Sequence, residues 1–519
     1  MKWLQRTIVI GYTLMMAVIL AIVLLVFDTM WFGGQKEFLM LQSRIVLAGL
    51  AGLALVCLLL GGLDSRIRPA DKNARGWLSV ELMFWAAIFV MQAVYCFHAY
   101  FMTGWDAGLV LYNAYMLAAY DVIPDFTYYS NYPNNIFITE IFAAVIRLFR
   151  ALVGDPGVDR CAYVLIVLQC ALNTCAGMLC RRVARRLTGS TAFSVAAAAV
   201  YIGFIGISPW MMIPYSDSMG LVFPIAILYL YQSQQGMRKP MLQWGGIVVL
   251  SVCGFLLKPQ ILIVTIAILI LETARLLGER NARAWLCRVG GVTLLILMGL
   301  GPVKQAFFDR SAIEVDPEGS VGLGHYIMMG VNEETAGVYS QDDFLKSVSI
   351  KDREERTRMQ LETAAQRIKE MGLKRLLIHL RLKTLVNYAD GTFAWGIIGN
   401  FVEEELEDKD DVLSPWLKDM VYMDGSGFKG FATYLQCVWL GLLAGSLLCG
   451  VASRGLAERS GHILMAILLS IIGLTVFEWI FEARARYLYT YAPFYVLAGM
   501  SGIWYAIRRG KEVKHDQRG

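Results

Sequence analysis

Long apolar segments alternate with shorter polar ones along almost the whole chain. A helix needs roughly 20 apolar residues to cross a bilayer core about 30 Å thick. Segments of this kind occupy residues 7–27, 45–63, 78–100, 160–180, 191–210, 217–234, 242–257, 260–274, 290–308, 431–450, 462–481 and 487–507. The pattern predicts an all-α polytopic membrane protein with about twelve transmembrane helices.

A further apolar segment, residues 134–153, differs because Glu140, Arg147 and Arg150 interrupt it at helical spacing. This pattern is typical of an amphipathic helix that lies along a membrane surface. Cytoplasmic loops are enriched in lysine and arginine. If 134–153 were a span, the arginines within 181–186 would lie outside, against this rule. We therefore expect both termini in the cytoplasm and 134–153 along the outer interface.

This topology divides the chain into four parts. They are two additional N-terminal transmembrane helices (1–77), a transmembrane core (78–308) that contains the first outer loop (101–135), an extracytoplasmic segment (309–430), and C-terminal transmembrane helices with a basic cytoplasmic tail (431–519). Within the third part, residues 350–371 form a predicted polar helix that Gly372 ends. Residues 373–388 suit an amphipathic helix in the membrane interface.

Composition agrees with this class and narrows the chemistry. Of the 519 residues, 57% are hydrophobic and 17% charged, whereas soluble domains have about 45–50% and about 25%. The ten cysteines lie mostly in apolar segments without metal-type spacing. The sequence lacks a P-loop, a dinucleotide fingerprint and zincin spacing, and we expect no nucleic-acid partner. A divalent metal is compatible with the sequence but unsupported, because no clustered carboxylates are evident, and no cofactor is predicted.

The stretch from Gly104 to Asn135 combines carboxylates with aromatic rings and contains no lysine or arginine. Its members include Asp106, Asp121, Asp125, Trp105, Tyr128, Tyr129 and Tyr132. Aromatic rings stack on the faces of sugars, and a carboxylate near a hydroxyl can accept its proton. An acidic aromatic loop between membrane helices therefore suits sugar chemistry. The alternative is an ordinary interfacial loop with an aromatic belt.

Three cations stand where predicted spans meet the outer surface: Lys258, Arg484 and Arg486. Ionisable residues at a membrane boundary are costly and are therefore candidates for function. Guanidinium groups match phosphate oxygens, which indicates an anion site. The alternative is that these side chains snorkel to the interface.

Three further ionisable residues have strong structural alternatives. Asp217 begins a predicted span, where aspartate is also a favoured helix N-cap. The position of Lys304 at the end of a predicted span is also explained by a side chain that snorkels to the membrane surface. His325 is explained by a structural role with satisfied hydrogen bonds.

Four short motifs on the predicted outer face resemble those of a known group of enzymes. They are Trp105-Asp106 after a span, Tyr132-Pro133-Asn134-Asn135 at the start of the amphipathic helix, Ser216-Asp217-Ser218, and Arg484-Ala485-Arg486-Tyr487 with Pro493 beyond it. In this order and location they resemble the GT-C superfamily of polytopic glycosyltransferases. The closest resemblance is to glycosyltransferase family 39, which holds protein O-mannosyltransferases and aminoarabinose transferases. Segments 325–334 and 390–395 look like those of bacterial cell-surface polysaccharide members.

This resemblance implies a GT-C-like helical bundle surrounded by membrane lipids. It implies inverting transfer of a sugar from a polyprenyl-phosphate donor to an extracytoplasmic glycan, teichoic acid, lipid or protein. Asp106 would then be the catalytic base and Asp217 a second catalytic carboxylate, while Lys258, Arg484 and Arg486 would hold the lipid phosphate. The other substrate-binding residues that it implies are Trp105, Tyr128, Tyr129, Tyr132, Asn134, His325 and Tyr487.

Two other classes of function are alternatives. A flippase or transporter would need ionisable residues near the bilayer midplane and broken helices in repeated halves, whereas the charges here gather at one face. If the protein were a subunit of a membrane assembly or a receptor, the carboxylates of the acidic loop would have no catalytic role. The sequence contains no Asn-x-Ser/Thr sequon, which favours a bacterial plasma membrane over the endoplasmic reticulum.

Overall fold

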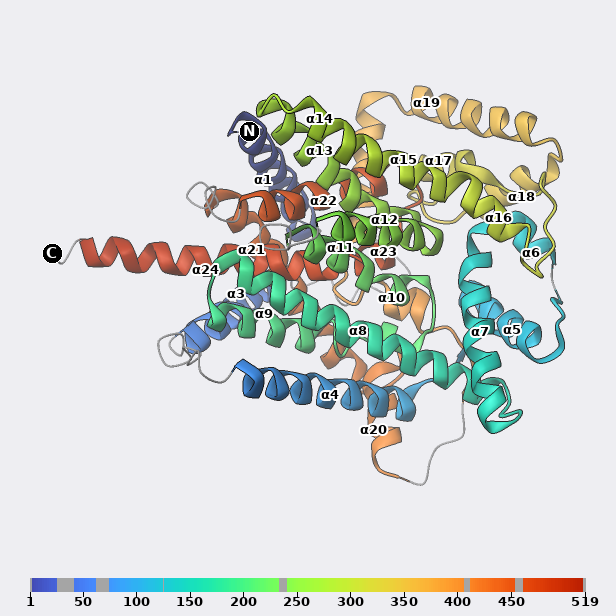
Figure 1. Cartoon of the computed structure of the whole chain (residues 1–519), viewed down its shortest axis with the longest axis horizontal. Helices are drawn as coiled ribbons and strands as arrows, with labels where there is room; N and C mark the ends of the chain where they lie inside the picture. Colours follow the sequence, from blue (N-terminus) through green and yellow to red (C-terminus); the bar gives the residue numbers. More distant parts are fainter. Residues whose placement is uncertain are drawn as a thin grey trace.

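The computed structural model describes residues 2–25, 42–61, 74–124, 126–232, 240–405, 411–452 and 461–516. Over these residues the chain folds almost entirely into helices, most of which run side by side in one bundle (Figure 1). The bundle helices are α1 (Lys2–Leu24), α3 (Gln42–Gly61), α4 (Ala74–Ala99), α8 (Val158–Thr188), α9 (Thr191–Phe204), α10 (Ser216–Gly220), α11 (Val222–Gln232), α12 (Pro240–Leu257), α13 (Leu262–Gly278), α14 (Ala282–Trp285), α15 (Gly291–Met298), α16 (Lys304–Phe308), α21 (Phe428–Ala452), α22 (Gly461–Ile480), α23 (Ala485–Tyr489) and α24 (Ala492–Asp516).

Helices occupy each of the twelve ranges that the apolar segments predict. Among the described residues, seven helices are long and apolar enough to cross a membrane, and three shorter helices are also apolar. The seven are Trp3–Leu24, Leu78–Ala99, Val158–Thr188, Pro259–Gly278, Ala282–Phe308, Phe428–Val451 and Gly461–Ile480. A helical membrane protein is thus confirmed, whereas the number of twelve spans stays a prediction.

The closest approaches between bundle helices depend on glycine. A Cβ atom built on Gly502 of α24 would lie 1.9 Å from the carbonyl oxygen of Gly445 on α21. A Cβ atom on Gly49 of α3 would lie 2.0 Å from the carbonyl oxygen of Cys437, also on α21. Small residues let helix backbones approach closely in a membrane, where packing replaces the hydrophobic driving force. Through these contacts the N-terminal helix α3 is an integral part of the bundle.

A second group of helices gathers at the end of the bundle away from the chain termini, on the right in Figure 1. It comprises α5 (Trp105–Tyr120), α6 (Phe126–Asn131), α7 (Ile136–Val153), α17 (Gly322–Gly330), α18 (Gln341–Ser349) and α19 (Arg353–Tyr388). A further short helix, α20 (Leu413–Val421), lies at the bottom of the same view. These helices come from the predicted outer loop 101–135, the predicted interfacial helix 134–153 and segment 309–430.

Helix α7 confirms the predicted amphipathic helix. It runs across the direction of the long bundle helices (Figure 1) and buries Phe142 and Ile146 on one face. Arg147 and Arg150 each donate a hydrogen bond of 3.0 Å to a backbone carbonyl group near the end of α5. Cations at a helix C-terminus satisfy carbonyl groups that lack partners within the helix. The two arginines therefore fix α5, the helix that begins with the motif residues.

Segment 309–430 also confirms one predicted helix end. The chain turns at Gly372, whose φ of 56° is a conformation that glycine adopts without strain, so the predicted end of the polar helix is confirmed. Lys383, in the second half of α19, is fully buried and donates to the carbonyl groups of Gly330, Trp479 and Phe481 at 2.6–2.9 Å. This lysine joins α19 to the ends of α17 and α22.

The prediction of an all-α fold misses one short sheet. Strand β1 (Met102–Thr103) pairs antiparallel with β2 (Val402–Glu404), with Met102 opposite Glu404 and Thr103 opposite Val402. Segments this short carry no periodic signal, and the pairing joins residues far apart in the sequence. The pair anchors the start of α5 to the segment that follows α19.

Candidate active site

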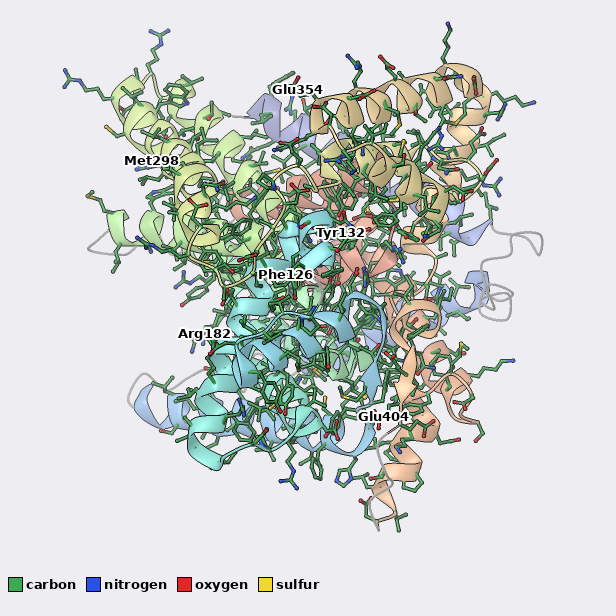
Figure 2. The ribbon with its side chains drawn as sticks, turned by 90° about the vertical axis from the view of Figure 1, so that its right-hand side faces the viewer. Phe126, Tyr132, Arg182, Met298, Glu354 and Glu404 are labelled. Atoms are coloured by element: carbon green, nitrogen blue, oxygen red, sulfur yellow. The ribbon has the colours of Figure 1, made fainter. Side chains whose placement is uncertain are left out.

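One cavity of about 670 Å³ lies at the end of the bundle that carries α5–α7 and α17–α19. Figure 2 looks onto this end, with Tyr132 near the centre, Glu354 of α19 above it and Glu404 of β2 below. The volume falls in the range of about 300–1,000 Å³ that is usual for small-molecule sites. Ten predicted site residues line the cavity: Trp105, Asp106, Tyr128, Tyr132, Asn134, Lys258, His325, Arg484, Arg486 and Tyr487.

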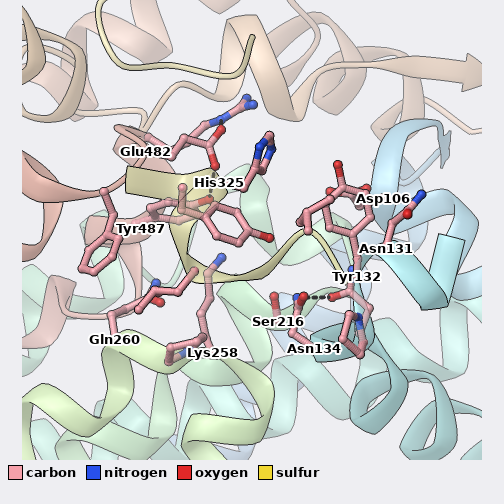
Figure 3. A pocket seen from close by; sticks show the side chains of 18 of the residues that line it. Asp106, Asn131, Tyr132, Asn134, Ser216, Lys258, Gln260, His325, Glu482 and Tyr487 are labelled. Atoms are coloured by element: carbon pink, nitrogen blue, oxygen red, sulfur yellow. Dashed lines mark hydrogen bonds and ion pairs between the residues drawn. The ribbon is translucent and has the colours of Figure 1, made fainter. Parts of the chain in front are cut away.

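Asp106 stands in the first turn of α5, at one side of the cavity (Figure 3). A helix N-terminus favours negative charge. The Oδ1 atom of Asp106 accepts a hydrogen bond of 3.2 Å from the Tyr128 hydroxyl, which in turn accepts one of 2.5 Å from Asn135 Nδ2. Asn135 Oδ1 accepts from the Tyr215 hydroxyl at 3.3 Å. This chain of three polar side chains holds one carboxylate oxygen of Asp106 in a fixed direction.

Trp105, the residue before Asp106, has an unusual backbone conformation with a φ of 47°. A non-glycine residue in this region is strained, and such strain persists where the surrounding structure imposes it. Here the Trp105 ring packs edge-on against Tyr215, with ring centres 5.1 Å apart, and the Arg486 guanidinium lies 4.4 Å from the Trp105 ring centre. Trp105 therefore connects the Asp106 side of the cavity with its cationic side.

The cationic side is built around a buried carboxylate. Asp217, only 1% exposed, pairs with Lys258 through Oδ1, and its Oδ2 lies 3.8 Å from Arg486 Nε. Burial lowers the pKa of Lys258 to about 8, although Asp217 opposes the shift. The Nε and Nη1 atoms of Arg486 have no hydrogen-bond partner within the described part of the chain. Arg486 thus keeps donors available at the cavity wall.

A second ion pair continues this wall. Arg484 Nε donates to Glu482 Oε1 at 2.8 Å, and the Tyr487 hydroxyl donates to Glu482 Oε2 at 3.1 Å. Burial would raise the pKa of Glu482, but Arg484 and Arg486 outweigh it and lower the pKa. Lys258 Nζ lies 4.5 Å from the centre of the Tyr487 ring. Figure 3 shows Lys258, Tyr487 and Glu482 facing the same space as Asp106.

Aromatic side chains line the cavity between the Asp106 side and the cationic side, and Tyr132 and Phe344 among them are called the aromatic roof below. The rings of Tyr132 and Phe344 stack with centres 5.9 Å apart and planes 12° apart. Tyr326 and Tyr339 also line the cavity. Phe344, Tyr326 and Tyr339 come from segment 309–430. Sequence reasoning quoted Tyr326 within 325–334 but did not single out any of the three as a site residue. It also did not single out Asn135, which belongs to a quoted motif, or Tyr215 and Glu482, which lie within two residues of one.

Two predicted site residues lie outside the cavity lining. Tyr129 is fully buried, and its hydroxyl lies 2.8 Å from Thr139 Oγ1 on α7; the interpretation of Tyr129 as a sugar platform is therefore wrong. Asp217 lies behind Lys258 and Arg486 as their counter-ion. Its alternative role as an N-cap is also wrong, because Tyr215 occupies the cap position of α10 and no side chain caps it.

Asp121, another acidic residue of the loop, does not join Asp106. Asp121 is exposed at the end of α5 and pairs with Arg147 at 3.0 Å. Asp125 lies outside the described residues. In the described ranges no group of three or more His, Cys, Asp or Glu side chains could hold a metal ion. Lys304 lines the cavity with its Nζ 5.2 Å from the centre of the Phe308 ring.

Comparisons with known proteins establish the class of the chain. No curated protein and no solved structure matches it. A family model described as "conserved hypothetical integral membrane protein" matches residues 1–504. The match includes both N-terminal helices and every segment that lines the cavity. Because it covers nearly the whole sequence, the chain belongs to this family of integral membrane proteins.

Proposed function

We propose that this protein is an integral-membrane glycosyltransferase that moves a sugar from a polyprenyl-phosphate donor to an acceptor hydroxyl outside the cytoplasm. One observation carries the proposal: a single cavity has a carboxylate, Asp106, on one side and the cations Lys258, Arg484 and Arg486 on the other, of which Arg486 has unpartnered donors. The four motifs that resemble the GT-C superfamily all contribute residues to this cavity or to the wall behind it. The site is expected on the outer face of a bacterial plasma membrane.

The cationic side suits a phosphate group. Nη1 of Arg486 has no hydrogen-bond partner among the described residues, so it can donate a charge-assisted hydrogen bond to a phosphate oxygen. The Arg486 guanidinium carbon lies 4.4 Å from the Trp105 ring centre and 5.7 Å from the Tyr215 ring centre, and Asp217 keeps Arg486 and Lys258 together. Donors that are already oriented stabilise the charge that develops on a leaving phosphate without reorganisation. Asp217 therefore acts in this proposal as a positioning residue.

The acidic side suits proton transfer. Asp106 Oδ1 is engaged by Tyr128, which leaves Oδ2 to accept the proton of an acceptor hydroxyl. The acceptor oxygen then forms a bond to the anomeric carbon of the sugar as the bond from that carbon to the phosphate oxygen breaks. The proton ends on Asp106, and the phosphate leaves with the electron pair of the broken bond. Attack opposite the leaving group inverts the anomeric configuration.

The apolar part of the lining suits the lipid tail of such a donor. It includes Phe255 and Leu256 at the end of α12, Phe308 at the end of α16, and Phe477 and Phe481 at the end of α22. These residues lie at the ends of apolar helices, next to the cations that would hold the phosphate. A polyprenyl chain attached to that phosphate can therefore continue along apolar surface.

A deletion strain tests the proposal. We expect mass spectrometry to show surface glycans that lack one sugar and a membrane pool enriched in the corresponding polyprenyl-phosphate sugar. A plasmid copy with intact Asp106 restores the glycan, whereas the Asp106→Asn copy does not. The Asp121→Asn copy, altered at an exposed carboxylate away from the cavity, restores it as well. Unchanged glycans and unchanged lipid pools in the deletion strain would contradict the proposal.

A further inference from the structure

His325 is a buried titratable side chain of the cavity wall that the proposed reaction does not use. It lies in the middle of α17, is fully buried, and lines the cavity (Figure 3). Its Nδ1 atom lies 3.0 Å from Ser347 Oγ on α18. Its Nε2 atom has no hydrogen-bond partner among the residues that the structure describes.

The surroundings of Ser347 decide which ring nitrogen carries the proton. The Ser347 hydroxyl has one hydrogen, which it donates to the carbonyl oxygen of Asp343 at 2.9 Å. Gln360 Nε2 donates to Ser347 Oγ at 3.0 Å and to the carbonyl oxygen of Val321 at 3.0 Å. When the Ser347 hydroxyl donates to Asp343, its oxygen accepts from His325, and Nδ1 then carries the hydrogen. In the neutral ring, Nε2 is then a bare acceptor.

The same surroundings keep the ring neutral and in place. Burial lowers the pKa of His325 and outweighs the opposing effects of Glu482 and Asp343. Asp343 is itself fixed by Arg367, with two bonds of 2.7 and 2.8 Å, and by Asn332 at 3.0 Å. Helices α17, α18 and α19 thus hold Ser347, and through it the imidazole, in one orientation. A buried acceptor held this firmly without a partner is costly unless a ligand fills it.

We propose that His325 Nε2 accepts a hydrogen bond from a hydroxyl of the sugar that occupies the cavity, and that it selects sugars with a hydroxyl at that position. This inference rests on the proposed glycosyl transfer and names His325 as a specificity-determining residue of that site. A site with a buried acceptor rejects a substrate that lacks the matching donor, because the acceptor then stays unpaired. The aromatic roof of Tyr132 and Phe344 lies next to the imidazole and restricts how the sugar ring can turn.

Two substitutions separate this role from a structural one. His325→Asn places an amide where Nδ1 was, which keeps the bond to Ser347 and removes the Nε2 acceptor. His325→Gln places an amide oxygen where Nε2 was and loses the bond to Ser347. With synthetic polyprenyl-phosphate glucose, mannose and galactose as donors, we expect His325→Asn to lower kcat/KM about tenfold to hundredfold. His325→Gln should keep most of the wild-type kcat/KM, because its amide oxygen replaces the Nε2 acceptor. A fully active His325→Asn with an impaired His325→Gln would overturn the proposal.

A spectroscopic measurement on the full-length protein needs no turnover. The chain has five histidines, so ¹⁵N-histidine labelling gives a short set of ring signals, and His325→Asn identifies those of His325. We expect the Nδ1-protonated neutral ring, and a shift of its Nε2 signal when methyl glucoside, methyl mannoside or methyl galactoside is added. An Nε2-protonated ring, or no shift with any of the three, would refute the proposal. Absence of transfer from every donor would refute the proposed function instead, and the ring signals would still decide the role of His325.

Discussion

The substitution Asp106→Asn tests the division of the cavity into a basic carboxylate and a phosphate site. Asparagine has nearly the same shape, and its Oδ1 can still accept the 3.2 Å hydrogen bond from Tyr128. The chain of bonds through Tyr128 and Asn135 to Tyr215 therefore survives. What disappears is the negative charge and the oxygen that accepts a proton.

The structure predicts a small effect of Asp106→Asn on stability and a large effect on the rate of transfer. Asp106 is half-buried and accepts one hydrogen bond from a neutral hydroxyl. The substitution should therefore change the free energy of unfolding of the protein by no more than about 1 kcal/mol. A general base contributes about 10²–10⁴-fold to the rate of a proton-transfer step. We therefore expect kcat to fall by about this factor, while the affinity for the polyprenyl-phosphate donor stays close to that of the wild type.

The assay compares purified wild-type and variant proteins in lipid nanodiscs. Transfer is followed with a radiolabelled polyprenyl-phosphate sugar, and donor binding is measured separately on the same preparations. Asp121→Asn is the matched control, because Asp121 is exposed, pairs only across the surface with Arg147, and has a left-handed φ of 52° that asparagine adopts readily. A folded Asp106→Asn protein that transfers sugar at the wild-type rate would refute Asp106 as the base.

Three further predictions concern the cations and the topology. Arg486→Lys keeps the charge but loses the planar guanidinium with its unpartnered Nη1 group, so affinity for the polyprenyl-phosphate sugar in nanodiscs should fall about tenfold to hundredfold. Equal affinity would exclude a phosphate contact. Because the pKa of Lys258 is lowered to about 8, its charge is present below that pH and lost above it. Affinity for a sugar phosphodiester should therefore decline as the pH rises through about 8, and Lys258→Ala should remove this decline; a flat wild-type profile would contradict it. In a cysteine-free background, Glu355→Cys should react with an impermeant thiol reagent on intact cells and Arg182→Cys should not, and the reverse would invert the topology.

The local parts of the site could be predicted from the sequence. Trp105-Asp106 and Arg484-Ala485-Arg486 are recognisable because a charge beside an aromatic ring at the end of an apolar run is unusual in membrane chains. Their meeting could not be predicted, since the Arg486 guanidinium reaches the Trp105 ring only through the packing of the C-terminal turn against the start of α5. The same limit explains the error at Tyr129, because which ring of the short helix α6 faces the cavity depends on the position of α7.

The sequence by itself determined the helical membrane class, the positions of the long helices, the amphipathic helix α7 and the turn at Gly372. These features depend on local hydrophobic runs and on the backbone freedom of one residue. Only the tertiary structure decided that Asp217 is a buried counter-ion, that β1 pairs with β2, and that His325 lines the cavity with its Nε2 atom unpartnered among the described residues. The physical reason is that these features depend on hydrogen bonds and ion pairs between distant segments, whose geometry no local pattern of residues records.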